Sequence, residues 1–488
     1  MTNILLINPP DDRMIQGAVP RELGRDRMGK FPPLGLLYLA SSAQKTFPSL
    51  NIRILDAIAD NLSHEDIANE IEACQPDIVG LSVYSFTLVD GIMVAEAAKQ
   101  RVPRCKVIVG GFHSGIYPRE TLSCSPHIDV SVAGEAEETF PLILEKMLDG
   151  APPTGISGVS CKLADGSLHV NADMPFIKDL DSLAFPDRRL VSYQKHTCIL
   201  GSTGLTTNIL ATRGCPYKCQ YCYVNIKKYR IRSLDNLMAE IHDCVSLGIR
   251  ELFFVDDLFN INKKHLLAFS KRVLQEGLKI TWNFRGRVNQ IDEEVLENAR
   301  EAGCTRIHYG VESGNQEILN RISKGTDLET IRRVISLTHR AGIEVSSNIM
   351  IGLPGESPVQ TEETVRFVLS LKTDYLQAAV FTPYPATPLY EEGMRTGLLK
   401  TDYWRQFALN PDPEFQPLIW GEFYTREQLF KQLRHLYRRF YLRPRFVLFY
   451  LRRMKNLAGL RQMLANLLTF IRLTLGSESR QINGRPQQ

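Results

Sequence analysis

The sequence predicts an α/β protein with an N-terminal doubly wound parallel sheet, a partial (β/α)6 barrel and a helical C-terminal tail. Short apolar strands alternate with helical stretches twice along the chain, and this alternation stops after Thr401. The chain has 488 residues, too many for one ordinary core. We expect a first domain at 1–145, a linker with a small hairpin at 146–200, the barrel at 201–400, and a helical region with a disordered end at 401–488.

The first segment is predicted to form the doubly wound sheet. Its strands are Asn3–Asn8, Asn51–Asp56, Asp77–Ser82, Lys106–Gly110 and Asp129–Ala133. Its helices lie near Leu34–Lys45, Ser63–Cys74, Val89–Gln100 and Glu137–Met147. Ligands of such sheets bind in the loops that follow the strands. Glycines in these loops allow a flat ligand to approach the backbone closely. The candidate contact residues are Pro9, Pro10, Ser82, Gly110, Gly111, His113, Gly134 and Glu135.

The linker and the second strand–helix series follow. Gly158–Val170 alternates like a hairpin, with Asp165-Gly166 as its turn. The strands of the second series are Thr207–Thr212, Glu251–Asp256, Thr281–Arg285, Arg306–Gly310, Glu344–Ile351 and Tyr375–Phe381. The helices between them are Ser233–Leu247, Lys263–Glu276, Glu293–Ala302, Leu328–Ala341 and Pro358–Leu371. Six such units fit an open barrel, whose functional groups lie at the carboxyl ends of the strands.

Composition limits the class of protein. Apolar residues make up 44% and charged residues 23% of the chain, as in soluble globular proteins. A net charge of +4 argues against a dedicated nucleic-acid binder, which would show a strong basic bias. The N-terminus lacks the basic region and cleavage site of a signal peptide, and no apolar run is long and clean enough to span a bilayer. We therefore expect a protein of the reducing cytoplasm.

Three closely spaced cysteines point to an iron–sulfur cluster. Cys215, Cys219 and Cys222 have the spacing Cys-x3-Cys-x2-Cys, directly after a predicted strand. A four-iron cluster normally takes four cysteine ligands, so three thiolates leave one iron open for a substrate or cofactor. A zinc site would want a fourth ligand, usually from a second cysteine or histidine pair, and no such pair occurs elsewhere. A disulfide is not expected in this compartment.

The run from Ala211 to Tyr223 resembles the signature of the radical SAM superfamily, including the aromatic Tyr221 before the last cysteine. The resemblance implies a 4Fe-4S cluster that reduces and cleaves S-adenosylmethionine (SAM). It also implies that Glu312 and Ser313 contact the ribose or methionine part of SAM, that Gly352 borders adenine, and that Arg285 lies near the SAM carboxylate or the substrate. Asp256-Asp257 stands where the superfamily usually has Gly-Gly-Glu. The structural alternative for Asp256 and Glu356 is a charge at a helix N-terminus.

The first segment resembles the cobalamin-binding domain that precedes many radical SAM modules. The similar residues are Asn8-Pro9-Pro10, Gly110-Gly111-x-His113 and Gly134-Glu135-x-Glu137. The cobalamin fingerprint Asp-x-His-x-x-Gly is incomplete, because the matching Asp56 loop has Ile58 where the cobalt-binding His would stand. His113 is either a cobalamin contact or a structural histidine of its loop. A sheet that has lost its ligand remains the alternative.

The resemblance implies an enzyme that functionalises an unactivated carbon. Methyl transfer is the first expectation, and a radical cyclisation like that of the anaerobic protoporphyrin ester cyclase is the second, since fold does not choose between them. A non-catalytic corrinoid or iron–sulfur binding protein is the alternative of another class. The expected partners are a small-molecule or lipid-like substrate and an electron donor such as flavodoxin or ferredoxin.

The C-terminal region is predicted to be helical over Thr425–Arg443 and Arg445–Leu475, with Pro444 between the two helices. Both helices are rich in arginine and leucine. A basic amphipathic helix can lie on an anionic membrane surface. The alternative is a helical lid packed on the barrel, with its charges solvated.

Overall fold

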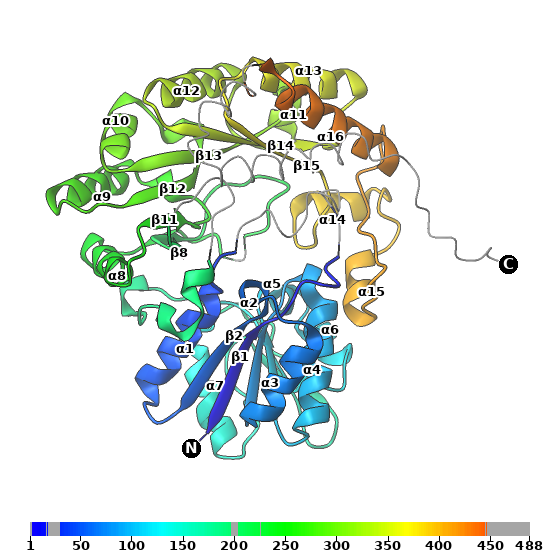
Figure 1. Cartoon of the computed structure of the whole chain (residues 1–488). Coiled ribbons are helices and arrows are strands. Elements are labelled where there is room, and N and C mark those ends of the chain that lie inside the picture. Colours follow the sequence, from blue (N-terminus) through cyan, green and yellow to red (C-terminus); the bar gives the residue numbers. More distant parts are fainter. Residues whose placement is uncertain are drawn as a thin grey trace.

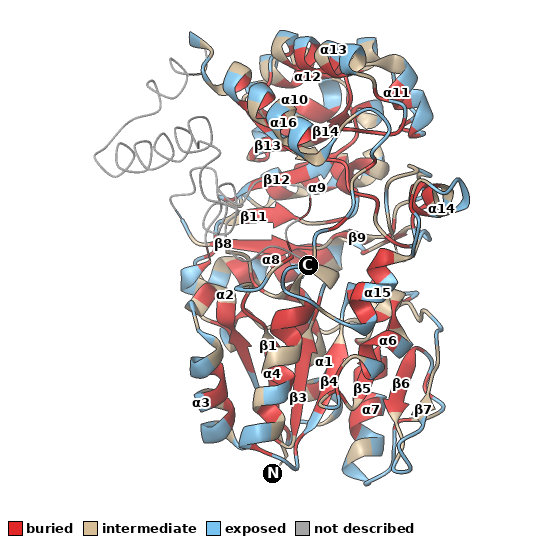
Figure 2. Ribbon diagram, turned by 90° about the vertical axis from the view of Figure 1, so that its right-hand side faces the viewer, coloured by how far each residue is buried: buried red, intermediate tan, exposed pale blue. Residues whose placement is uncertain are grey.

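The computed structural model describes residues 2–15, 17, 30–196, 204–224, 226–444 and 446. Two α/β units are stacked one above the other in Figure 1, with the N-terminal unit below. Figure 2 shows the same arrangement from the side, with buried strands between helices that turn one exposed face outward. Within the described residues, no helix is long and apolar enough to cross a membrane.

The first sheet has seven strands in the order β2-β1-β3-β4-β5-β6-β7. The five strands β1 to β5 are parallel, and β6 and β7 add to the edge in antiparallel pairing. The bounds are β1 Asn3–Asn8, β2 Asn51–Asp56, β3 Ile78–Ser82, β4 Lys106–Gly110, β5 Val130–Val132, β6 Val159–Lys162 and β7 Leu168–His169. The hairpin predicted in the linker therefore extends the first sheet.

Helices cover both faces of this sheet, as the doubly wound prediction requires. Apolar side chains of α1 and α7 pack on one face, and those of α3, α4 and α6 pack on the other. The bounds are α1 Leu34–Thr46, α2 Ala57–Asp60, α3 His64–Cys74, α4 Leu88–Arg101, α5 Phe112–Ile116, α6 Pro118–Ser123 and α7 Thr139–Leu148. The helix α3 begins with a capping box in which Ser63 and Asp66 satisfy each other's backbone N–H groups.

The second sheet has six parallel strands in the order β15-β14-β13-β12-β11-β8, so it is an open barrel with β8 and β15 at its two edges. The strand bounds are β8 Thr206–Ile209, β11 Glu251–Phe254, β12 Thr281–Gly286, β13 Cys304–Glu312, β14 Glu344–Ile351 and β15 Tyr375–Val380. The helix bounds are α8 Leu234–Ser246, α9 Lys263–Gln275, α10 Glu293–Glu301, α11 Gln316–Arg321, α12 Leu328–Arg340 and α13 Pro358–Ser370. The partial (β/α)6 barrel is confirmed.

The first strand of the barrel ends earlier than predicted. We expected Thr207–Thr212, but β8 ends at Ile209, and Thr212–Arg213 forms β9, which pairs with β10 (Arg230–Ile231). The reason is the buried carboxylate of Asp256, which accepts the backbone N–H groups of Ala211 and Thr212. These donors are therefore not available to the barrel sheet.

The C-terminal region packs on both units. The helix α15 (Tyr403–Leu409) follows α14 (Pro388–Arg395) and places Trp404 and Phe407 in the apolar cluster of the first sheet. The helix α16 (Arg426–Tyr441) places Leu429, Leu433 and Phe440 in the barrel core. The expected helix Thr425–Arg443 is thus confirmed as a packed helix. The expected helix Arg445–Leu475 lies almost entirely outside the described residues, and its contact with a membrane stays a prediction.

Two tyrosines of α16 satisfy the edge of the barrel sheet. The hydroxyl of Tyr437 accepts from the N–H of Ala378 and donates to its carbonyl, both at 2.9 Å. The hydroxyl of Tyr441 does the same at Leu376, at 3.2 and 2.9 Å. Leu376 and Ala378 are two residues apart on β15, so their main-chain N–H and C=O groups point to the same side of the strand. That side faces away from β14 and is the open edge of the sheet.

Candidate active site

The three cysteines lie on one loop at the carboxyl end of the barrel. Cys215 and Cys219 are partly buried and Cys222 is exposed. Two neighbouring aspartates after β11 shape the start of this loop. Asp256 accepts from the backbone of Ala211 and Thr212, and Asp257 accepts from the N–H of Gly214 at 2.9 Å. Asp256 therefore anchors the cysteine loop and is not a charge at a helix N-terminus.

The donor set of this loop fits a cubane cluster. In the described part of the chain, no three His, Cys, Asp or Glu side chains are grouped closely enough to bind a single metal ion. A cubane requires no such grouping, because each thiolate binds a different iron. Desolvation of its sulfur, together with the nearby thiols of Cys219 and Cys215, raises the pKa of Cys222 to about 12. Three thiols on one partly open loop are suited to bind a cluster, because its iron ions balance the negative charge of the thiolates.

A buried cluster of polar side chains lies beside the cysteine loop. Glu312, at the end of β13, accepts from the hydroxyl of Tyr221 at 3.1 Å and from Nζ of Lys324 at 2.8 Å. Lys324 also donates to the Tyr221 hydroxyl at 3.1 Å. Glu312 has a left-handed backbone, with φ of 66°. A side chain at Gly310 would lie 2.4 Å from a Glu312 oxygen and 2.7 Å from Lys324 Nζ, so this glycine leaves room for the ion pair.

Two other predicted SAM contacts, Arg285 and Ser313, differ in their exposure to solvent. Arg285 is exposed at the barrel mouth, and its guanidinium lies 5.5 Å from the Phe253 ring centre. Ser313 is fully buried, and its hydroxyl is bonded to Thr364 of α13 at 3.1 Å. This contact favours a structural role for Ser313.

The loop after β14 is held by a buried carboxylate. Gly352 donates its N–H to Glu356 at 2.6 Å, and Leu353 donates to the same oxygen at 3.1 Å. Burial raises the pKa of Glu356 to about 7. Gly352 has φ of +76°, and an added Cβ would lie 2.7 Å from Leu429 of α16. Glu356 therefore shapes the loop and is not merely a charge at the start of α13.

In the first sheet, the strand order identifies the ligand-binding edge. The order reverses between β1 and β3, and ligands of such sheets bind at this switch point. The loops at this point are Asn8-Pro9-Pro10 and the one that follows Ser82. The Asp56 loop follows the edge strand β2. Its carboxylate is buried, accepts from Asn8 at 2.9 Å and contacts Nε2 of His196 at 3.1 Å. The Asp56 carboxylate is therefore occupied by contacts within the protein, and the loop has Ile58 where the fingerprint has its histidine.

Aromatic rings of the two units contact each other. Tyr84, after β3, and Phe112, after β4, are 50% and 43% exposed and stack with ring centres 5.5 Å apart. Phe112 also makes an edge contact with Tyr223, at 6.4 Å. Tyr223 directly follows Cys222. The ligand-binding edge of the first sheet therefore faces the cysteine loop.

His113 is a buried histidine of its loop. It is fully inaccessible, and its Nδ1 lies 3.0 Å from the Ser85 hydroxyl. Burial lowers the pKa of His113 to about 3, so the ring is neutral. Its Nε2 has no hydrogen-bond partner within the part of the chain that the structure describes. These contacts favour the structural reading of His113.

The loop after β5 joins the two units. Glu135 accepts two hydrogen bonds from Arg230, at 2.6 and 2.8 Å, and Glu137 accepts from Arg213 at 2.6 Å. Gly134 has φ of +76°, and an added Cβ would lie 2.4 Å from the Pro175 carbonyl oxygen. Gly134 and Glu135 are thus occupied by contacts within the protein.

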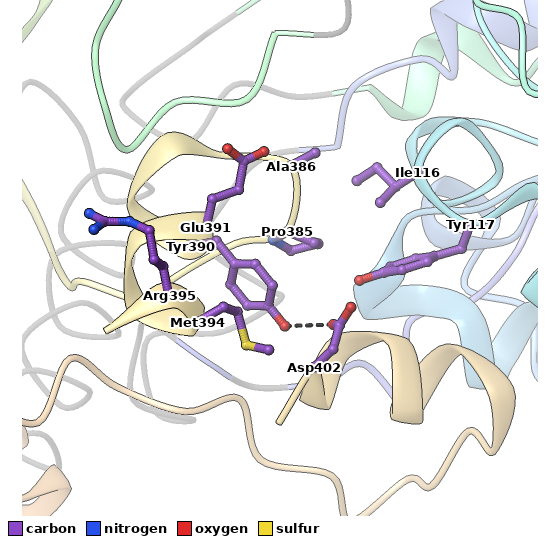
Figure 3. A pocket seen from close by; sticks show the side chains of 9 residues that line it. All are labelled: Ile116, Tyr117, Pro385, Ala386, Tyr390, Glu391, Met394, Arg395 and Asp402. Atoms are coloured by element: carbon purple, nitrogen blue, oxygen red, sulfur yellow. Dashed lines mark hydrogen bonds between the residues drawn. The ribbon is translucent and has the colours of Figure 1, made fainter. Parts of the chain in front are cut away.

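A pocket of about 580 Å³ lies where α5 and α6 meet the segment after β15 (Figure 3). Ile116, Pro385 and Met394 give it apolar walls. The Tyr390 hydroxyl donates to Asp402 at 2.7 Å. The buried Tyr117 hydroxyl has no hydrogen-bond partner in the described ranges. The pocket lies beside the loops described above, because Leu389, next to Tyr390, donates its N–H to the carbonyl of Gln220 in the cysteine loop at 3.1 Å.

Comparisons with known proteins agree with both halves of the structure. Residues 22–144 match the B12 binding domain family, and residues 209–368 match the radical SAM superfamily. The chain is 32% identical to an uncharacterized methyltransferase of Pyrococcus horikoshii over 91% of this chain and 94% of that protein. It is 28% identical to an anaerobic magnesium-protoporphyrin IX monomethyl ester cyclase of Cereibacter sphaeroides over 86% of this chain and 68% of that one.

Among solved structures, the fold is similar to that of TsrM, a radical SAM methyltransferase from Kitasatospora setae. The TM-score is 0.67 at 18% sequence identity, over 81% of this chain and 78% of that chain.

These similarities define the class of protein. The chain belongs to the cobalamin-binding branch of the radical SAM superfamily. It is an enzyme whose cofactors are a 4Fe-4S cluster, SAM and cobalamin, and the alternative of a non-catalytic binding protein is set aside.

Several residues around the cysteine loop and the first sheet were not predicted from the sequence. Lys324 follows a short helix, where a cation is ordinarily explained by the helix dipole. Only its place in the fold brings it to Glu312. The aromatic residues Tyr84 and Phe112 lay in the expected loops, and the signal that could have singled them out is that large rings are unusual in otherwise small and polar loops.

The Gly111→Ala variant tests the cobalamin edge. Gly111 has φ of +109°, and an added Cβ would lie 2.6 Å from the Val83 carbonyl oxygen, so the loops after β3 and β4 must separate. Backbone strain of about 1–3 kcal/mol is expected to weaken cobalamin binding roughly tenfold, measured by absorbance titration. Gly155→Ala is the control, since it also has positive φ but no described atom within 4 Å of an added Cβ. Equal affinity in both variants would contradict this placement.

Proposed function

We propose that this protein is a cobalamin-dependent radical SAM methyltransferase that adds a methyl group to an unactivated carbon of a small-molecule substrate. The observation that carries the proposal is the contact of Phe112 with Tyr223, because it places the ligand-binding edge of the first sheet against the cysteine loop. A methyl donor and a radical generator must face one substrate, and this arrangement allows it. The name of the Pyrococcus horikoshii relative supports the same reaction.

Each part of the site has a proposed task. Cys215, Cys219 and Cys222 would hold the cluster. When bound, the cluster and SAM supply a carbon-centred radical and cobalamin supplies the methyl group. Glu312, fixed by Lys324, would accept hydrogen bonds from SAM hydroxyls, with Tyr221 beside it.

The remaining site residues are proposed from their position. The backbone of Gly110 and Gly111 would border the corrin together with Ser82, Pro9 and Pro10. Arg285 carries a cation at the barrel mouth, where it would bind a carboxylate of SAM or of the substrate. An electron donor such as flavodoxin or ferredoxin is the expected partner for the cluster.

Radical cyclisation is the second candidate, because a protoporphyrin ester cyclase matches most of this chain. The two reactions use SAM differently. Methyl transfer consumes one SAM as methyl donor, which leaves S-adenosylhomocysteine, and a second SAM as radical source, which leaves 5'-deoxyadenosine. Cyclisation needs only the second.

The experiment follows from this difference. Reduced, cofactor-loaded enzyme is mixed with SAM, and both products are measured by chromatography. The methyltransferase proposal predicts S-adenosylhomocysteine in an amount that tracks the bound cobalamin. Formation of 5'-deoxyadenosine alone, from enzyme with a full load of cobalamin, would favour the cyclase.

A further inference from the structure

Arg287 is a buried cation beside the cysteine loop. It follows β12 and is 7% exposed. Its Nη1 lies 3.4 Å from Sγ of Cys219, and its guanidinium stacks over the Tyr217 ring at 3.8 Å. Its backbone is fixed on both sides by the buried amide of Asn260, which donates to the Arg287 carbonyl at 2.8 Å and accepts from its N–H at 3.0 Å.

The partners of Arg287 leave its charge unbalanced. Its Nη2 donates to the carbonyl of Lys324, and its buried Nε finds no hydrogen-bond partner among the described residues. No ion pair with a carboxylate is found for it among the described residues, whereas the buried arginines Arg188 and Arg306 have Glu240 and Glu344. Burying a charge without a counter-charge is costly. The acidic group that Arg287 does face is the thiol of Cys219.

The turn after α11 fixes both Arg287 and the cysteine loop. The carbonyl of Ile322 accepts from the N–H of Gln220 at 3.0 Å, and the carbonyl of Lys324 accepts from Arg287. Nζ of Lys324 reaches Tyr221. The turn is tight, because Ser323 and Gly325 both have positive φ, 54° and 65°. Arg287 is therefore held in place from the turn, from Asn260 and from Tyr217, and cannot easily move away from Cys219.

We propose that Arg287 is a positioning residue that supplies the counter-charge for the Cys219 side of the cluster and raises its reduction potential. This inference rests on the assignment of the three cysteines as cluster ligands. Reduction adds negative charge to a cluster, and a fixed cation with an N–H directed at a ligand sulfur stabilises the reduced form. The consequence is a cluster that the cell's electron donor can reduce more readily.

The test measures the potential directly. The cluster is reconstituted without SAM in the wild type, Arg287→Gln and Arg287→Lys, and an EPR-monitored redox titration gives each potential. Arg287→Gln keeps an N–H donor but loses the charge, so its potential is expected to fall below that of the wild type. Arg287→Lys keeps the charge and is expected to stay closer to the wild type. Arg306→Gln is the control, because Arg306 is also buried and stacked over a tyrosine, Tyr375, but pairs with Glu344, and no contact between it and the three cysteines is found among the described residues.

Each outcome decides the proposal. An unchanged potential in Arg287→Gln at full iron content would overturn it. If Arg287→Gln takes up no iron while Arg287→Lys does, the charge is needed for assembly, which supports the counter-charge role. If neither variant holds iron, Arg287 is only a packing residue and the proposal is wrong. Failure of the proposed methyl transfer would look different, since it concerns S-adenosylhomocysteine and leaves these potentials unaffected.

Discussion

Replacing Cys215, Cys219 and Cys222 together by alanine is expected to abolish both iron binding and SAM cleavage. Anaerobically reconstituted wild-type protein should hold about four irons per chain, as one cubane requires. The triple variant should hold none, because no other described cysteine lies in this loop. Iron is measured by colorimetric assay and 5'-deoxyadenosine by chromatography.

The control is Cys304→Ala. Cys304 is fully buried in the barrel core, and burial raises its pKa. Its variant should retain the full iron content and SAM cleavage after allowance for a small loss of stability. SAM cleavage by the triple variant would show that the site has been assigned to the wrong residues.

The second large effect is expected on stability. Glu240 on α8 is completely buried between two arginines, accepting from Arg188 at 2.7 Å and from Arg232 at 2.5 Å. Arg188 belongs to the segment that leads into the barrel, and it also donates to Thr207 on β8 at 2.9 Å. Replacing Glu240 by alanine leaves two buried cations without a carboxylate. Breaking a buried pair in this way costs about 3–5 kcal/mol, and thermal unfolding should show a large fall in midpoint.

The control for this variant is Glu276→Ala. Glu276 pairs with Arg272 and His242 at the surface, and such pairs contribute under about 1 kcal/mol. A pH series adds a second check. Burial raises the pKa of Glu240, but the two arginines outweigh this and keep it below its ordinary value. The stabilisation is therefore present above the unfolded pKa of about 4.3 and is lost as pH falls through the folded pKa. Equal midpoints for the two variants at neutral pH would contradict the role of the buried triad.

The sequence predicted the local parts of the fold well. Strand–helix alternation located every parallel strand of both sheets, because apolar periodicity and helix caps are local signals. The hairpin at Val159–His169 was recognised, but its partner was not, since pairing with β5 is a contact between distant residues. The end of β8 was misplaced for the same reason: it depends on the carboxylate of Asp256, which lies 44 residues from Thr212 in the sequence.

The candidate site likewise combines a local sequence pattern with contacts between distant residues. The cysteine spacing is a local pattern, and it was sufficient to propose a cluster loop. Lys324, Arg287 and Tyr221 come from three different parts of the chain, and only the closed fold shows that they converge. Glu135 looked like a ligand contact in its loop, but its arginine partner Arg230 lies 95 residues away. A carboxylate beside a glycine does not show from sequence alone whether it faces a ligand or another domain.

The tyrosine hydroxyls at the edge of the barrel have a consequence for self-association. An open barrel ends in a strand whose outward N–H and C=O groups would form a template for a strand from another molecule. At Leu376 and Ala378 those groups are already taken by Tyr441 and Tyr437. The helix α16 thereby blocks the addition of a further strand, and its leucine side chains pack in the barrel core. Loss of this helix, by proteolysis or by a premature stop codon, would leave an unpaired strand edge and an exposed apolar core. The protein would then be expected to aggregate.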